Sequence, residues 1–280
     1  MIESICICGA GTMGSGIAQV CAMNGMNTII YDLNEKILTT AKSNIAANLD
    51  NLANKNRITR IERQTMFERI QFVNESNYCC ADLIIEAIVE KLEVKVKLFN
   101  QLSELNNAEV IFATNTSSLS VSAIQKHVLR PSRVIGMHFF NPAPVMKLVE
   151  VVQGNLTSDE VVQVIMNLAI QLGKTPVKCK DAPGFIVNRV ARHYYLEAMR
   201  LVEQGTATIE NIDAIMEATG FKMGPFKLMD MIGMDINLSV SQSLYDAFDH
   251  ESRFRPSAMQ VEKVEKGELG KKSGKGFYQY

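Results

Sequence analysis

Short runs of almost uninterrupted apolar residues alternate with longer amphipathic segments over the first two thirds of the chain. Strands that are covered by helices on both faces of a parallel sheet have this composition. Most of the segments between the runs carry apolar residues at helical spacing, which predicts an α/β fold. The predicted strands span residues 4–8, 28–32, 70–73, 82–88, 110–114, 134–137, 148–152 and 175–179.

Two helices, at about 34–54 and 59–69, are predicted between the second and third strands. A simple crossover needs one helix, so we expect this hairpin to project from the sheet. Its basic residues are candidates for phosphate contact, and a solvated helical face is an equal alternative for each of them. These residues are Lys42, Lys55, Arg57 and Arg60.

From Phe185 onward the pattern predicts helices only, after a break at residues 181–184. The sequence therefore predicts two domains, an α/β domain at 1–184 and an all-helical domain at 185–280. The methionine-rich segment 229–234 in the second domain fits either a subunit interface or a core.

A glycine-rich turn joins the first strand to the first helix, and the second strand ends in Asp32. Gly9 permits the turn, Gly11 lets a pyrophosphate approach the backbone, and Gly14 lets the helix pack on the strand. With Thr12 and Met13 at the helix start, this pattern predicts a Rossmann-type dinucleotide-binding domain. The Asp32 carboxylate would bind the ribose hydroxyls and repel a 2′-phosphate, which favours NAD over NADP. A chance glycine turn is the alternative, and the agreement of several features argues against it.

Polar residues also follow the fifth predicted strand, in the loop Asn115–Ser120. Ligands of such sheets bind at the carboxyl ends of the strands, so this hydroxyl-rich loop is a candidate binding element. Ser118 or Ser120 would also serve as the N-cap of the helix that follows. Both roles are compatible.

One acid, Glu150, interrupts the apolar strand at 148–152. A buried carboxylate without a partner is costly, so a partner is expected nearby. His138 follows the adjacent strand and is the nearest candidate. A single histidine is more often a core or loop residue, but its coincidence with Glu150 favours a functional pair.

Charge and cysteine usage exclude several classes of protein. The net charge of −1 gives no general attraction to nucleic acid or to an anionic membrane. The sequence has no membrane-spanning run and no targeting pattern, so we expect a cytoplasmic protein. Its six cysteines lack the spacing of a disulfide framework or a zinc site, and we expect reduced core residues and no metal. Cys6 and Cys8 share a strand face, but no second pair completes a metal site.

Five segments of the chain resemble the 3-hydroxyacyl-CoA dehydrogenase family, and its bacterial 3-hydroxybutyryl-CoA members in particular. The resemblance covers the whole chain, and its second and third segments are highly specific to the family. The segments span residues 9–19, 115–119, 138–150, 183–189 and 274–278.

The resemblance implies the catalytic roles. His138 would be the general base that takes the 3-hydroxyl proton, and Glu150 would hold the far imidazole nitrogen. Ser117 and Asn188 would bind the reacting oxygen and the thioester region of the substrate. Because Asn188 belongs to the helical domain, this site would span both domains.

The same resemblance implies cofactor and partner contacts. Glu90 and Lys95 would contact the cofactor ribose, and Asn115 and Asn141 would also lie at the cofactor; a solvent-facing helix lysine is the alternative for Lys95. Coenzyme A would meet the helical hairpin at Lys55, and the helical domain would form a homodimer. The implied reaction is the NAD-dependent oxidation of short (3S)-3-hydroxyacyl-CoA and its reversal.

Three alternatives remain open at this stage. A dehydrogenase of a free hydroxy acid or sugar acid would use the same scaffold. Related enzymes use a lysine four residues after a glycine as acid/base, but here Gly184 is followed at that distance by Asn188. A non-catalytic NAD-binding protein is expected to lack one of the four proposed catalytic residues, and all four are present.

Overall fold

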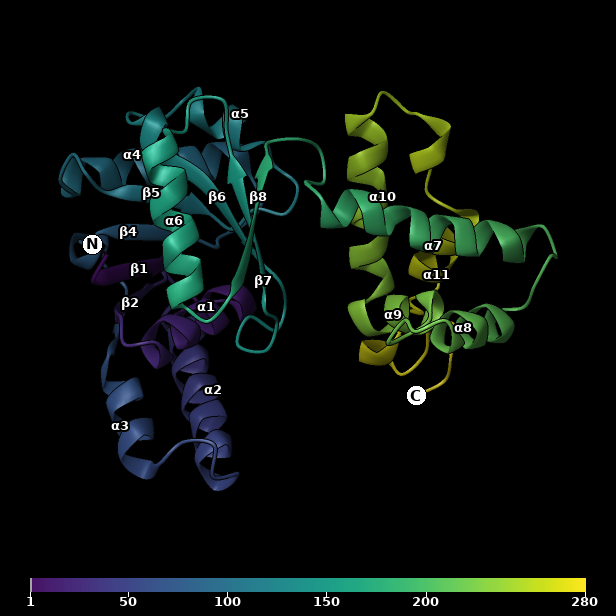
Figure 1. The fold of residues 1–280 in the computed structure, drawn as a ribbon, viewed down its shortest axis with the longest axis horizontal. Helices are drawn as coiled ribbons and strands as arrows, with labels where there is room; N and C mark the ends of the chain where they lie inside the picture. Colours follow the sequence, from purple (N-terminus) through teal and green to yellow (C-terminus); the bar gives the residue numbers. More distant parts are fainter. Residues whose placement is uncertain (1) are drawn as a thin grey trace. The chain divides into compact units, whose positions relative to one another are not determined.

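The computed structural model describes residues 2–280, which form two compact units. The first unit extends to Ala182, and the second begins at Pro183 (Figure 1).

Eight strands form one sheet in the first unit, in the order β3-β2-β1-β4-β5-β6-β7-β8. Neighbouring strands in the described chain are parallel except for β6 and β7, which are antiparallel. The strands are β1 (Ser4–Cys8), β2 (Asn27–Tyr31), β3 (Ile70–Val73), β4 (Leu83–Glu86), β5 (Ile111–Thr114), β6 (Val134–Phe139), β7 (Leu148–Gln153) and β8 (Thr175–Lys180).

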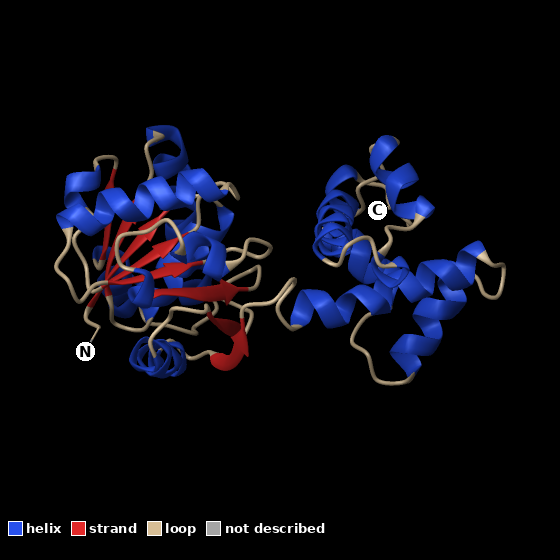
Figure 2. Cartoon of the chain, turned by 90° about the horizontal axis from the view of Figure 1, so that it is seen from above, coloured by secondary structure: helices blue, strands red, loops and turns tan. Residues whose placement is uncertain are grey.

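Helices lie on both faces of this sheet (Figure 2). The α-helices of the first unit are α1 (Thr12–Met23), α2 (Glu35–Asn54), α3 (Arg60–Glu68), α4 (Leu92–Leu105), α5 (Val121–Gln125) and α6 (Asp159–Gln171). Short 3₁₀ turns, η1 (Ser76–Tyr78) and η2 (Pro131–Arg133), complete the connections. The arrangement confirms the predicted α/β, Rossmann-type fold. No helix among residues 2–280 has the length and apolar character to cross a membrane.

The hairpin of α2 and α3 extends away from the sheet, as the two consecutive helical patterns predicted (Figure 1). Thr59 begins α3 with a capping box in which its hydroxyl accepts from the Glu62 N–H and the Glu62 carboxylate accepts from the Thr59 N–H. The two helices are joined by Arg63, whose guanidinium donates to both carboxylate oxygens of Asp50 at 2.8 and 3.1 Å. This ion pair was not predicted from the sequence.

Four of the six cysteines, Cys6, Cys8, Cys21 and Cys79, are buried, as expected for core thiols. The Sγ atoms of Cys6 and Cys8 lie 4.0 Å apart on one face of β1. Cys80 is exposed and Cys179 is half-buried, so the expectation of core positions is wrong for these two. Among the described residues, no group of three or more His, Cys, Asp or Glu side chains is arranged to hold a metal ion.

The second unit is all-helical, as predicted. Its α-helices are α7 (Val187–Glu203), α8 (Ile209–Ala218), α9 (Pro225–Ile232), α10 (Met234–Ala247) and α11 (Ala258–Glu265), with 3₁₀ turns η3 (Ser252–Phe254) and η4 (Lys271–Ser273). Met229 and Met234 are fully buried in its core, whereas Met231 is 57% exposed. The methionine-rich segment therefore supplies core contacts and one exposed apolar side chain.

Two buried aspartates anchor the C-terminal segment to this unit. Asp230 accepts hydrogen bonds from the N–H groups of Phe277 and Tyr278, both at 2.9 Å. Asp213 accepts from the Tyr278 hydroxyl at 2.7 Å and from the first-turn N–H groups of α9. The Asp213 carboxylate thus caps the start of α9 and also holds the C-terminal segment.

Substitution of Asp230 by asparagine should destabilise the second unit. The amide presents a donor to backbone N–H groups that need an acceptor, and one unsatisfied buried group costs about 1–3 kcal/mol of unfolding free energy. Urea unfolding followed by tyrosine fluorescence measures this, because the chain has no tryptophan and five of its seven tyrosines lie in the second unit. Asp246→Asn, on the exposed side of α10, is the control and should stay within about 0.5 kcal/mol of the parent. Equal stabilities of the two variants would refute the anchoring role.

Alkaline pH should also weaken this anchor. Burial and the hydrogen bond to Asp213 raise the pKa of Tyr278 above its usual value of 10. The folded state then holds the phenolic proton more tightly than the unfolded chain, so the contribution is complete below pH 10 and is lost as the pH rises further. Urea midpoints from circular dichroism should fall as the pH rises above about 10, and should fall less in Tyr278→Phe. An identical fall in both proteins would contradict this.

Candidate active site

His138 and Glu150 face each other across the antiparallel pair β6 and β7, where they are direct register partners. The Nδ1 atom of His138 lies 2.8 Å from Oε2 of Glu150. The Glu150 side chain is 1% exposed and that of His138 is 8% exposed. A contact of this length in a dry environment fixes the imidazole ring, and an Nδ1–H that donates to Glu150 leaves Nε2 for proton exchange.

The antiparallel direction of β7 was not predicted, although the sequence carries a signal for it. The two strands are joined by residues 140–147, which is too short for the helical crossover that parallel strands require. This connection includes Asn141, one of the predicted cofactor residues. Lys174, directly before β8, holds the connection by donating from Nζ to the carbonyl oxygens of Ala143 (2.5 Å) and Met146 (2.9 Å).

The glycine-rich turn has the geometry of a phosphate site. Gly9 has φ +102°, and a Cβ there would lie 2.6 Å from the carbonyl oxygen of Ala87. A Cβ on Gly14 would lie 1.7 Å from the carbonyl oxygen of Gly9, so only glycine lets α1 begin this close to the turn. Gly11 is the N-cap of α1, so the N-cap residue offers no side-chain acceptor to the first N–H groups of the helix.

Asp32 directly follows β2, and its carboxylate is held by two backbone donors. Its Oδ2 accepts from the Ala10 N–H and its Oδ1 from the Asn34 N–H, both at 2.9 Å. The carboxylate therefore sits beside the glycine-rich turn in a fixed orientation, which is the position that a ribose requires in this type of fold.

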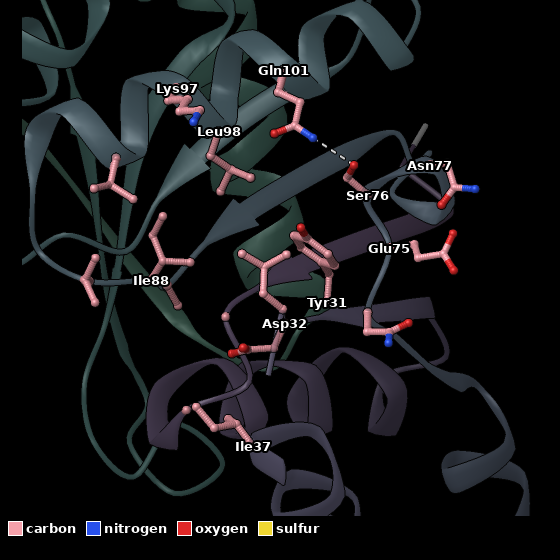
Figure 3. Close-up of a pocket in the computed structure, with 17 residues that line it drawn as sticks. Tyr31, Asp32, Ile37, Glu75, Ser76, Asn77, Ile88, Lys97, Leu98 and Gln101 are labelled. Carbon is pink, nitrogen blue, oxygen red and sulfur yellow. Dashed lines mark hydrogen bonds between the residues drawn. The ribbon is translucent and has the colours of Figure 1, made fainter. Parts of the chain in front are cut away.

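A cavity of about 920 Å³ opens beside Asp32 and the turn (Figure 3). Its walls come from the end of β2, from η1 and from α4, with Tyr31, Ile88 and Leu98 among the apolar residues that line it. Gln101 of α4 donates to the Ser76 hydroxyl at 2.8 Å and joins two of these walls. No sequence motif marks the lining residues from η1 and from the face of α4, so they were not predicted.

Lys95 is 1% exposed, so the alternative of a solvent-facing lysine is wrong. Its Nζ lies 2.5 Å from Oε1 of Glu86 and 3.0 Å from Oε2 of Glu90. Burial raises the pKa of Glu86, against the lowering effect of Lys95 and the hydrogen bonds. Burial also raises the pKa of Glu90, but the charge of Lys95 and the hydrogen bonds from Thr116 and the loop N–H groups outweigh burial, so the pKa of Glu90 is lowered overall.

The loop after β5 is built around the Glu90 carboxylate. Its Oε1 accepts from the Thr116 hydroxyl, from the Ser117 N–H at 3.1 Å and from the Ser118 hydroxyl at 3.0 Å. Asn115 joins the same loop to β6, because its side-chain oxygen accepts from the Phe139 N–H at 2.9 Å. Ser120 is the N-cap of α5 and accepts from the Ala123 N–H. Of the two cap candidates, Ser120 fills the role.

The remaining predicted residues are described by the elements that carry them. Thr12 and Met13 begin α1 at the glycine-rich turn. Lys55 is exposed at the end of α2, on the projecting hairpin. Asn188 lies in the first turn of α7, in the second unit, and its role stays a prediction.

Family models match both units. The NAD binding domain of 3-hydroxyacyl-CoA dehydrogenase matches residues 4–182, and the C-terminal domain of the same family matches residues 184–280. The chain is 46% identical to the 3-hydroxyadipyl-CoA dehydrogenase of Escherichia coli K12, over 100% of this chain and 59% of that protein. It is 40% identical to the probable 3-hydroxybutyryl-CoA dehydrogenase of Deinococcus radiodurans, over 98% of this chain and 99% of that one.

Solved structures agree with these matches. The fold is similar to that of a 3-hydroxybutyryl-CoA dehydrogenase from Escherichia coli K12, with a TM-score of 0.97 and 46% identity over 100% of this chain and 60% of that one. It is also similar to the (S)-3-hydroxybutyryl-CoA dehydrogenase of Ralstonia eutropha, with a TM-score of 0.95 and 38% identity over 100% of this chain and 99% of that one. With both units matched, the chain belongs to the 3-hydroxyacyl-CoA dehydrogenase family, whose N-terminal domain binds NAD.

Proposed function

We propose that this chain catalyses the reversible oxidation of short (3S)-3-hydroxyacyl-CoA thioesters to 3-oxoacyl-CoA, with 3-hydroxybutyryl-CoA and acetoacetyl-CoA as the reference pair. The observation that carries this proposal is the buried contact of 2.8 Å between His138 and Glu150 within the NAD-binding unit. The names of several relatives support the short acyl chain.

His138 is the general base in this proposal. Its Nε2 takes the proton of the substrate 3-hydroxyl while Nδ1–H donates to Glu150, whose carboxylate stabilises the imidazolium that results. Bound NAD supplies the hydride acceptor. In the reverse direction the imidazolium returns the proton to the 3-oxygen.

The chain's own residues fit NAD. The N–H groups at the start of α1 suit the pyrophosphate, and the Asp32 carboxylate, with the cavity beside it, suits the adenosine. Glu90, Lys95, Asn115 and Asn141 are proposed for the ribose and nicotinamide half. Ser117 and Asn188 are proposed to bind the reacting oxygen and the thioester region of the substrate.

The proposal also includes a coenzyme A contact. Lys55 on the α2–α3 hairpin binds coenzyme A, and an unchanged KM for acyl-CoA in Lys55→Ala would refute this.

The proposed oligomeric state is a homodimer formed by the second unit. It is supported by exposed apolar side chains such as Val190 (67%), Ile215 (61%) and Ile236 (51%). A monomer by light scattering would refute it.

The proposed compartment is the cytoplasm. The six free cysteines suit a reducing compartment of this kind, and a disulfide found in the native protein would argue against it.

A panel of substrates tests the reaction class. We expect NADH-dependent reduction of acetoacetyl-CoA and no turnover of free acetoacetate or of sugar acids. Acyl chains of increasing length, and a thioester with a terminal carboxylate such as 3-oxoadipyl-CoA, measure the breadth of the acyl site. Turnover of the free acids with none of any acyl-CoA would contradict the proposal.

Substitution of His138 by glutamine should remove most of the activity. Glutamine keeps a polar side chain but cannot act as acid or base near neutral pH, so kcat should fall by about 10²- to 10⁴-fold. NADH affinity, measured by fluorescence titration, should stay near that of the parent. His127→Gln, at an exposed histidine, is the matched control and should keep full activity. A His138→Gln protein with near-normal kcat would contradict the assignment.

A further inference from the structure

A second acidic residue lies in an otherwise apolar strand of the sheet, as Glu150 does in β7. Glu86 is the last residue of β4, and its side chain is fully buried. Its Oε1 accepts from Lys95 Nζ at 2.5 Å and from the Ile88 N–H at 2.8 Å, and its Oε2 accepts from the Thr114 hydroxyl at 2.7 Å. Both carboxylate oxygens are thus engaged from three different segments.

One chain of contacts leads from Glu86 to the Ser117 loop through Lys95. The ammonium group bridges Glu86 and Glu90, and Glu90 in turn accepts from the Ser117 N–H. An ammonium has three donors, and these two carboxylates fix its position. The orientation of the Glu90 carboxylate, and with it the backbone of the loop, follows from the position of Lys95.

A second chain of contacts reaches the same loop through β5. The Thr114 hydroxyl donates to Glu86 and accepts from the Thr116 N–H at 3.2 Å. The Asn115 N–H donates to the Glu86 carbonyl oxygen at 2.8 Å. Glu86 therefore contacts both the beginning of the loop and the cation that orders its middle.

Stability alone does not account for a charged group at this place. A buried ion pair is often no more stable than a well-packed apolar pair of the same volume, but it does fix charged groups in a definite geometry. We propose that Glu86 is a positioning residue for the dehydrogenase reaction, because its carboxylate fixes Lys95 and the loop that carries Ser117. This inference rests on the proposed function, in which Lys95 serves the cofactor and Ser117 the substrate.

A double-mutant cycle tests the inference. The kcat/KM for acetoacetyl-CoA, at saturating NADH, is measured in the parent, Glu86→Gln, Ser117→Ala and the double variant. Saturating NADH removes any effect on cofactor affinity, which is measured separately as the KM for NADH. We expect Glu86→Gln to lower kcat/KM by about tenfold, since displacement of a binding group is costly. In the Ser117→Ala background, Glu86→Gln should lower kcat/KM by less than roughly threefold, because the two residues act as one unit.

Asp82→Asn is the matched control, because Asp82 precedes the same strand at its other end and accepts from the Glu3 and Ser4 N–H groups at 2.9 Å. This variant should lose stability without change in kcat/KM.

If Glu86→Gln does not fold, Thr114→Val takes its place in the cycle, because it removes one of the two chains of contacts at nearly constant side-chain volume. The same coupling with Ser117→Ala is expected.

Three results would overturn the inference. The first is a loss of kcat/KM in the double variant that equals the product of the two single losses. The second is a kcat/KM of Glu86→Gln within twofold of the parent. Either would refute the role of Glu86, while a parent that is active and depends on Ser117 would still uphold the proposed function. A parent that reduces no acyl-CoA would refute both.

Discussion

The contact between His138 and Glu150 depends on the direction of one strand. In a wholly parallel sheet the carboxyl ends of neighbouring strands meet at one edge, and a residue in the middle of β7 would not face the end of β6. The antiparallel pairing brings the two residues into direct register, with one carboxylate and one imidazole in a dry layer of the sheet. The short connection at residues 140–147 imposes that direction, and Lys174 holds the connection in place.

Two buried acids of this sheet have partners of different chemistry. Glu86 is paired with an ammonium and a hydroxyl, which hold its carboxyl group in one orientation beside the surrounding backbone. Glu150 is paired with an imidazole, a ring with two nitrogens that can each carry or release a proton. A buried carboxylate is unfavourable without a partner. Lys95 is the partner of Glu86, and His138, a group suited to proton transfer, is the partner of Glu150.

Much of this organisation was predictable from local pattern. The apolar runs, the glycine-rich turn and the cap at Ser120 depend on residues close in sequence, and the runs and the turn predicted the fold and the start of the cofactor site. An acid within an apolar strand predicted a buried partner for Glu150, and the same pattern is present at Glu86, for which no partner was predicted. The direction of β7, the burial of Lys95 and the walls of the cavity depend on contacts between distant segments, which no local pattern specifies. The anchoring of the tail by Asp213 and Asp230 is of the same kind.

The central claim is that Glu150 holds His138 in one tautomer, with the proton on Nδ1 and the lone pair on Nε2. Nitrogen-15 NMR of the histidine-labelled protein measures this directly, with the His138 signals assigned by their absence from a variant that lacks this ring. At a pH where the ring is neutral, we predict a protonated, pyrrole-type Nδ1 and a pyridine-type Nε2. A pyridine-type Nδ1 with a protonated Nε2, or an even mixture of the two tautomers, would contradict the account.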